Sequence, residues 1–80
     1  MAKLPILSSR EIVRILKRMG FEHAPKRGKG SHLAFVRKSG GVTRLVIVPD
    51  KNEIPSGTLL SILSQAGLTK EEFLNALEHR

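Results

Sequence analysis

Residues 27–35 read RGKGSHLAF and place one histidine between a glycine-rich basic turn and an apolar strand. The imidazole of His32 can gain or lose a proton near neutral pH, since an unperturbed histidine titrates at about 6.5. Cleaving RNA without a metal requires a base for the 2′-OH proton, an acid for the leaving oxygen and cations for the developing negative charge. One imidazole can supply either proton transfer. Judged from the residues alone, the simpler alternative is that His32 only begins a strand and hydrogen-bonds a carbonyl.

The loop before His32 has the composition of a phosphate-binding turn. Its glycines can adopt positive φ and expose backbone N–H groups, and cations stand between them. The predicted phosphate ligands are Lys26, Arg27, Gly28, Lys29, Gly30 and Ser31, with Arg37 and Lys51 neutralising charge nearby. The spacing matches neither a P-loop nor a dinucleotide-binding motif, and a solvated turn without function is an equal alternative.

The remaining polar residues offer less chemistry. His23 is expected on a solvent-facing edge strand and His79 in the last helical turn, so the histidines lack the spacing of metal ligands. The carboxylates are scattered as helix caps and surface charges, without a pair that could hold two metals. Ser31 and His32 point to opposite faces of a strand, which disfavours a Ser–His nucleophile pair. We therefore expect no metal and no cofactor.

Positive charge is concentrated in the first two thirds of the chain. Residues 1–51 contain 12 Lys/Arg and 3 Asp/Glu, a net charge of +9, and residues 52–80 contain 2 and 4, a net charge of −2, which gives +7 in total. Clustered positive charge favours a polyanionic partner such as nucleic acid over a general solubility role. The chain has three Phe and no Tyr or Trp, so RNA contact would depend on phosphate charge and shape instead of base stacking.

Length and composition predict one small cytoplasmic domain, residues 1–80, with a single core. There is no cysteine, which excludes disulfides and thiolate ligands. The N-terminal apolar run is too short for a signal peptide, and no stretch approaches the roughly 20 apolar residues of a membrane span. We expect no contact with a membrane.

The elements that position these residues can be read from periodicity and turn signals. SSREIVRILKRMG predicts a helix with a Ser8–Glu11 capping box that ends at Gly20. FEHAP is a short extended segment, and HLAFVRK and VTRLVIV form a hairpin around the turn SGG. In this hairpin Leu33 and Phe35 share a face with Leu45 and Ile47, and His32, Ala34 and Val36 share the other with Arg44 and Val46. Since both faces carry aliphatic side chains, we expect helices on one face and a partner on the other.

Two more helices follow. SGTLLSILSQAG is predicted to be capped by Ser56, to end at Gly67 and to bury Leu59, Leu60, Ile62 and Leu63. TKEEFLNALEHR begins with a Thr69–Glu72 capping box. The order is α-β-β-β-α-α, an α+β fold with a three-stranded antiparallel sheet packed on helices. Its α-β-β-β-α part has the order of double-stranded-RNA-binding domains, with the last helix as an addition, a likeness of fold that does not determine function.

Three stretches, GFEHAPKRGKGSHLAFVR, RLVIVP and IPSGTLLSILSQAGLTKEEFLNAL, resemble the HicA (YcfA-like) toxins, over most of the chain from Ser9 to Leu77. These are small mRNA interferases of toxin–antitoxin pairs. The resemblance implies a fold similar to the double-stranded-RNA-binding domain and metal-independent endonucleolytic cleavage of mRNA. It places the catalytic histidine at His32, with the family's preceding glycine and serine at Gly30 and Ser31. It also implies a HicB antitoxin that covers the catalytic face.

The chain departs from this family at one place. Members often carry a second histidine shortly after the proline that ends the third strand, whereas PDKNEIP has Asp50 and Lys51 there. Either that histidine is dispensable, or its absence reduces or abolishes activity. Lys51 could replace a cation at this position but not a neutral base.

The residues and this resemblance together predict the first of three functions, with the other two as alternatives. The first is a toxin that cleaves RNA with His32 and leaves a 2′,3′-cyclic phosphate or its hydrolysis product. The second is a non-catalytic RNA-binding module of the same fold, whose affinity would fall steeply with salt and would not depend on His32. The third is a small protein-interaction domain without an RNA role.

Overall fold

The computed structural model describes residues 4–25 and 30–78. The helices are α1 (Ser9–Arg18), α2 (Ser56–Ala66) and α3 (Lys70–Glu78), and the strands are β1 (Glu22–His23), β2 (His32–Ser39) and β3 (Val42–Pro49). The strands form one antiparallel sheet in the order β1-β2-β3. The predicted α+β fold, with the order α-β-β-β-α-α, is confirmed.

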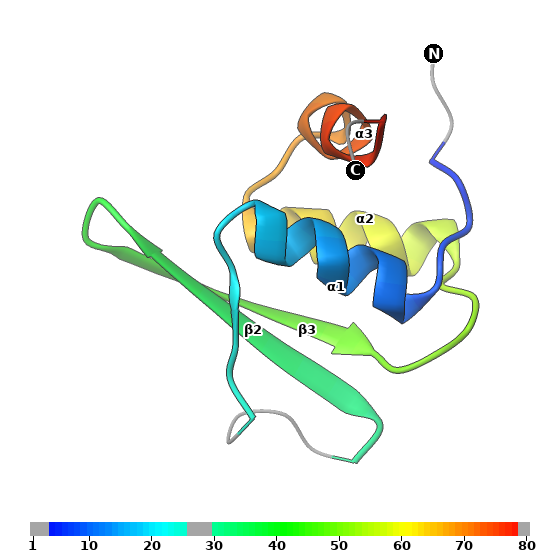
Figure 1. Cartoon of the computed structure of the whole chain (residues 1–80), viewed down its shortest axis with the longest axis horizontal. Helices are drawn as coiled ribbons and strands as arrows, with labels where there is room; N and C mark the ends of the chain where they lie inside the picture. The colour runs from blue at the N-terminus through cyan, green and yellow to red at the C-terminus, as the bar shows by residue number, and fades with distance from the viewer. Residues whose placement is uncertain (1–3, 26–29, 79–80) are drawn as a thin grey trace.

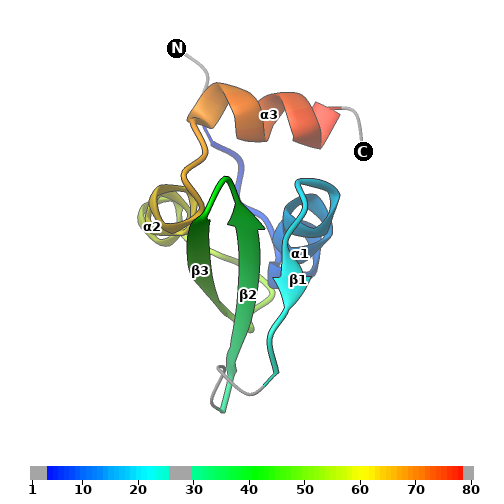
Figure 2. The same cartoon turned by 90° about the vertical axis from the view of Figure 1, so that its left-hand side faces the viewer.

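All three helices lie on one side of the sheet. In Figure 1, α1 and α2 pack side by side over the strands, and α3 lies on their far side. Figure 2 shows β2 between its two neighbours, with the β2–β3 hairpin standing in front of the helices. The prediction that helices cover one face of the sheet is therefore confirmed.

Both ends of α1 follow local rules. Ser8 accepts a hydrogen bond from the Glu11 N–H (3.2 Å), and the Glu11 carboxylate accepts one from the Ser8 N–H (3.2 Å), which is the predicted capping box. At the other end the Phe21 N–H donates to the Leu16 carbonyl (3.0 Å), and Gly20 has φ +97°. This is a Schellman motif, in which glycine is favoured because the left-handed conformation strains other residues.

The register of the hairpin differs by one residue from the sequence prediction. Only Gly40 and Gly41 form the turn, with φ of +57° and +81°, and Ser39 pairs with Val42. Two consecutive positive φ values are typical of a type I′ turn, whose twist suits a two-residue hairpin. Counting Ser39 as part of the turn shifted the predicted pairing by one residue, and such a shift moves every β3 side chain to the opposite face.

The observed register separates a core face from an outer face. Phe35 pairs with Val46 and Leu33 with Val48, and this core face is turned toward the helices. The prediction that Leu45 and Ile47 accompany Phe35 is therefore wrong. The outer face consists of His32, Ala34, Val36, Leu45, Ile47 and Pro49.

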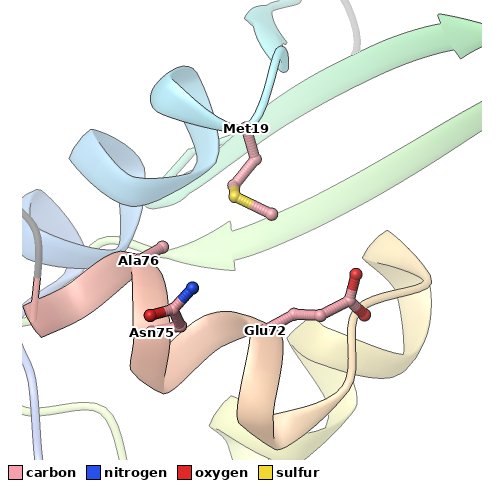
Figure 3. Close-up of a pocket in the computed structure, with 4 residues that line it drawn as sticks. All are labelled: Met19, Glu72, Asn75 and Ala76. Atoms are coloured by element: carbon pink, nitrogen blue, oxygen red, sulfur yellow. The ribbon is translucent and has the colours of Figure 1, made fainter.

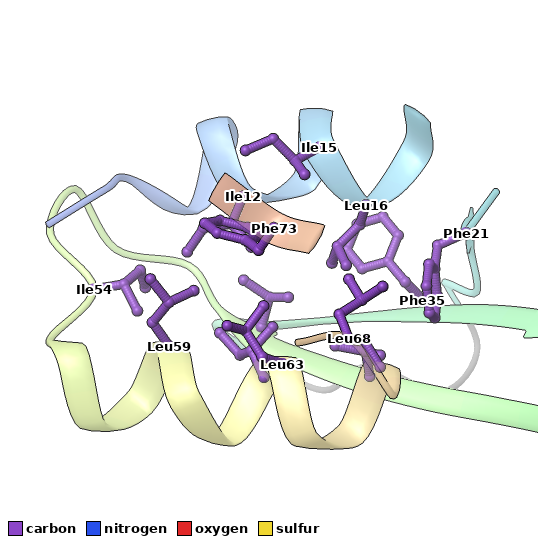
Figure 4. Close-up of a cluster of buried hydrophobic side chains, with 14 of the residues drawn as sticks. Ile12, Ile15, Leu16, Phe21, Phe35, Ile54, Leu59, Leu63, Leu68 and Phe73 are labelled. Atoms are coloured by element: carbon purple, nitrogen blue, oxygen red, sulfur yellow. The ribbon is translucent and has the colours of Figure 1, made fainter. Parts of the chain in front are cut away.

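One buried cluster joins the core face to the three helices (Figure 4). It contains Leu7, Ile12, Ile15, Leu16, Phe21, Phe35, Val46, Val48, Ile54, Leu59, Ile62, Leu63, Ala66, Leu68 and Phe73. All three phenylalanines are in it, as predicted. None of them is therefore available to stack on a nucleic-acid base.

Two details of α2 differ from the prediction. Its N-cap is Pro55, which has an extended conformation and makes no side-chain capping bond, and Ser56 is already helical. Leu60, which was predicted to be buried, is 44% exposed. The buried side of α2 runs through Leu59, Ile62 and Leu63, and Leu60 lies outside it. At the start of α3, Thr69 and Glu72 form the predicted capping box (2.9 and 3.1 Å), and these hydrogen bonds to Thr69 lower the pKa of Glu72.

Gly67→Ala should destabilise the protein by about 1–2 kcal/mol, because residue 67 has φ +71° and a side chain is strained in that conformation. The new methyl group would also displace the Arg44 guanidinium, whose Cζ would lie 2.5 Å away. Gly57→Ala in the same helix is the control, since a Cβ added there would meet no atom within 4 Å and its φ is ordinary. Urea unfolding monitored by circular dichroism should show a loss for Gly67→Ala alone. Equal stability of the two variants would contradict the assignment.

Candidate active site

His32 is the first residue of β2 and lies on the outer face. It is exposed and pairs with Pro49 of β3. Since the helices pack on the opposite face, its imidazole is not enclosed by α1, α2 or α3. A proton-transfer group in this position can reach a large substrate that approaches from outside.

The segment after β3 brings further polar groups to the same end of the sheet. The Asp50 N–H donates to the Ser31 carbonyl (2.6 Å), and the Lys51 carbonyl accepts from the Ser9 N–H (2.9 Å). Ser31, a predicted site residue, is thus bonded to Asp50, and the next residue, the predicted Lys51, is attached to the start of α1. Lys51 is exposed, so its ammonium group can meet an anion without prior burial.

Gly30 adopts the positive φ that was predicted for the loop. Its φ is +60°, and nothing lies within 4 Å of the position that a Cβ would take. The requirement for glycine here is therefore conformational and not steric. Lys26, Arg27, Gly28 and Lys29 lie outside the described residues, so their predicted role stays a prediction.

Arg37 is not brought to His32. It lies five residues further along β2, about 16 Å away at roughly 3.3 Å per residue, and an odd separation places it on the core face. Its Nη1 donates to the Met19 carbonyl (3.0 Å), and its Cζ lies 5.0 Å from the ring centroid of Phe21. Arg37 thus caps the C-terminal end of α1, where a cation is favourable. The sequence signal for this placement is that Arg37 lies two residues after Phe35 on the same strand, so the two side chains share the core face.

The other histidines are separate from this site. His23 pairs with Phe35 and its ring lies 5.3 Å from the Phe35 ring, three residues along β2 from His32. It is exposed, as predicted. His79 lies outside the described residues. Within residues 4–25 and 30–78, no three His, Cys, Asp or Glu side chains gather closely enough to hold a metal ion.

Two of the hollows in the described surface lie between α1 and α3 and beside Arg37. A shallow hollow between α1 and α3 is lined by Met19, Glu72, Asn75 and Ala76 (Figure 3). A second hollow lies beside Arg37 and Gly20. His32 is not among the residues that line these two hollows. None of the helices in the described ranges is long and apolar enough to cross a membrane.

A family model for the HicA toxin of bacterial toxin–antitoxin systems matches residues 9–68. The chain belongs to the HicA toxin family. The match contains His32, Ser31 and Lys51 and ends before α3. The protein is therefore the toxin of a toxin–antitoxin system, with a cognate antitoxin as partner, in a family known for RNase-like activity. Searches of curated proteins and of solved structures gave no match.

Sequence reasoning missed Asp50 and Ser9 as parts of this site. The Ser9 hydroxyl donates to the Asp50 carboxylate (3.2 Å) across 41 residues of chain. From the sequence, Ser9 was interpreted as an ordinary helical residue next to the Ser8 cap. Asp50 was noted only because it stands where related toxins often have a second histidine. No local pattern indicates that the two meet.

Arg37→Ala should lower the free energy of unfolding by about 1–3 kcal/mol, because it removes a charged hydrogen bond to Met19 and the contact with Phe21. Its affinity for RNA should fall no more than that of Lys38→Ala, which removes the same charge from an exposed neighbour. Urea unfolding and RNA binding at fixed salt measure the two effects. Unchanged stability with a selective loss of RNA affinity would return Arg37 to the phosphate-binding residues.

Proposed function

We propose that this toxin is a metal-independent endoribonuclease that cleaves mRNA, with His32 as its catalytic residue. The observation that carries this proposal is an exposed imidazole on the outer face of the sheet, next to Ser31, within the region that matches the HicA toxins. As an mRNA interferase it would act in the cytoplasm.

The reaction needs only proton transfers and charge stabilisation. The 2′-oxygen attacks the adjacent phosphorus as its proton is removed, the bond from phosphorus to the 5′-oxygen breaks, and that oxygen receives a proton. The products are a 2′,3′-cyclic phosphate and a free 5′-hydroxyl. His32 acts as the base or as the acid, and water or another group supplies the other transfer.

The phosphate is held by charge and by backbone N–H groups. Gly30 and Ser31 stand directly before the imidazole, and Lys51 follows Asp50, whose N–H donates to the Ser31 carbonyl. Together with the predicted ligands Lys26, Arg27, Gly28 and Lys29, they would stabilise the charge that develops on the phosphorane. Arg37 is left out of this set because its guanidinium is engaged at the end of α1.

The outer face is the surface that we assign to a HicB-like antitoxin. Leu45 is 38% exposed there, beside the half-buried Val36 and Ile47, and His32 lies at the end of the same face. An antitoxin that buries these apolar side chains would also cover the imidazole. One contact surface would then account for binding and for inhibition.

His32→Ala should reduce RNA cleavage by about 100-fold or more, the usual contribution of a general acid or base. The assay uses end-labelled single-stranded RNA with EDTA present, and His23→Ala is the control because that ring lies on another strand. Cleavage by the wild type and by His23→Ala alone would support the proposal. Equal cleavage by His32→Ala would refute it, and RNA binding without cleavage by any variant would identify a non-catalytic binding module.

Leu45→Glu should weaken binding of the cognate antitoxin by about tenfold or more, because it places a charge within the apolar outer face. RNA cleavage by the free toxin should stay unchanged. The matched control is Leu60→Glu, which adds the same charge at an exposed leucine of α2. Calorimetric titration measures both affinities. An equal effect of the two substitutions, or none, would show that the antitoxin binds elsewhere.

A further inference from the structure

We propose that Asp50 is a positioning residue that holds His32 in place by connecting it to the N-terminus of α1. The inference rests on the proposed function, because the geometry that it protects is that of the catalytic imidazole. Asp50 itself acts through other residues and does not touch the RNA.

The backbone of Asp50 extends the β2–β3 ladder past His32. The N–H of Ile47 points away from β2 and donates to Gln65 (2.8 Å), and Pro49 has no N–H to donate. The Asp50 N–H, which points toward β2, donates to the Ser31 carbonyl at 2.6 Å. The peptide unit directly before His32 is therefore held by this bond. Without it the ladder would stop at Leu33 and Val48, and His32 would lie at a free strand end.

The side chain of Asp50 anchors that bond to a rigid element. Its carboxylate accepts from the hydroxyl of Ser9, the first residue of α1, and Ser9 is only 5% exposed. A buried hydroxyl needs a partner, since an unsatisfied one is costly. The Ser9 N–H in turn donates to the Lys51 carbonyl (2.9 Å), so two consecutive residues are attached to the same helix end.

The carboxylate is placed where its charge can be tolerated. Asp50 lies opposite Ser31, one residue out of phase with His32, so its side chain is turned toward α1 and the imidazole toward the outer face. The N-terminus of a helix favours a negative charge. A carboxylate here can therefore fix the backbone of the site without facing the phosphate that the site has to bind.

A set of four variants tests this role. Asp50→Ala removes the carboxylate, Asp50→Asn keeps an oxygen that accepts from Ser9, and Ser9→Ala removes the same bond from its other end. Glu53→Ala is the charge-matched control, an exposed acid in the same loop. The measurements are kcat and KM for RNA in EDTA, and the unfolding temperature of each variant.

We expect Asp50→Ala to lower kcat by about tenfold or more, with KM within about twofold of the wild type, because a misplaced catalytic group slows the chemical step. Asp50→Asn should retain kcat within about threefold, and Glu53→Ala should leave it unchanged. Ser9→Ala should lower kcat, and the double variant Ser9→Ala/Asp50→Ala should lose no more than Asp50→Ala alone, since both remove one interaction. Equal kcat for Asp50→Ala and the wild type, or equal losses for the Ala and Asn variants, would overturn the proposal.

An NMR measurement keeps the positioning role separate from the RNase activity. The imidazole and amide resonances of His32 should shift in Asp50→Ala and in Ser9→Ala and stay in place in Asp50→Asn and Glu53→Ala. If the wild type cleaves no RNA, the proposed function fails, and these resonances still decide whether Asp50 positions His32. If Asp50→Ala is unfolded at the assay temperature, Ser9→Ala carries the same comparison. Unshifted His32 resonances in the folded variants would refute the role.

Discussion

The pairing of β2 with β3 decides which side chains face the helices and which lie on the outer face. Gly40 and Gly41 accept positive φ, so the hairpin closes in two residues and Phe35 meets Val46. This register supplies the sheet's contribution to the core and turns His32 outward in the same step. Because side chains alternate along a strand, a slip of one residue in β3 would bury Leu45 and Ile47 and expose the two valines, Val46 and Val48.

Helix α1 connects the two ends of this sheet. Its ten residues are about 15 Å long at 1.5 Å per residue, comparable to the stretch of β2 that separates His32 from Arg37. At its N-terminus Ser9 contacts the Asp50–Lys51 segment, and at its C-terminus the Met19 carbonyl accepts from Arg37. An acid therefore lies at the positive end of the helix and a cation at the negative end, which is the favourable arrangement for both.

The two faces of the sheet have separate tasks. The core face and the three helices provide the stability, with the three phenylalanines fully used there. The outer face keeps partly exposed aliphatic side chains beside an exposed imidazole, in a toxin family whose members have a cognate antitoxin. Exposed apolar surface of this kind is typical of a protein contact, and the positive charge of residues 1–51 is typical of a partner of RNA.

What the sequence by itself determined is local. Several features depend on residues within a few positions of one another. They are the order of the elements, the chemical competence of His32, the capping boxes at Ser8–Glu11 and Thr69–Glu72, and the helix ends at Gly20 and Gly67. The family could be identified at that level too, because its motifs are contiguous.

Only the tertiary structure decided the features that depend on contacts between distant residues. It also decided the strand register, which changes when the hairpin turn is one residue longer or shorter. It set the face of every β3 side chain, placed the Arg37 guanidinium at the end of α1, and brought Ser9 to Asp50 across 41 residues. The conformational preferences of neighbouring residues do not predict such long-range contacts. They form only when the helix and the hairpin pack together around one core.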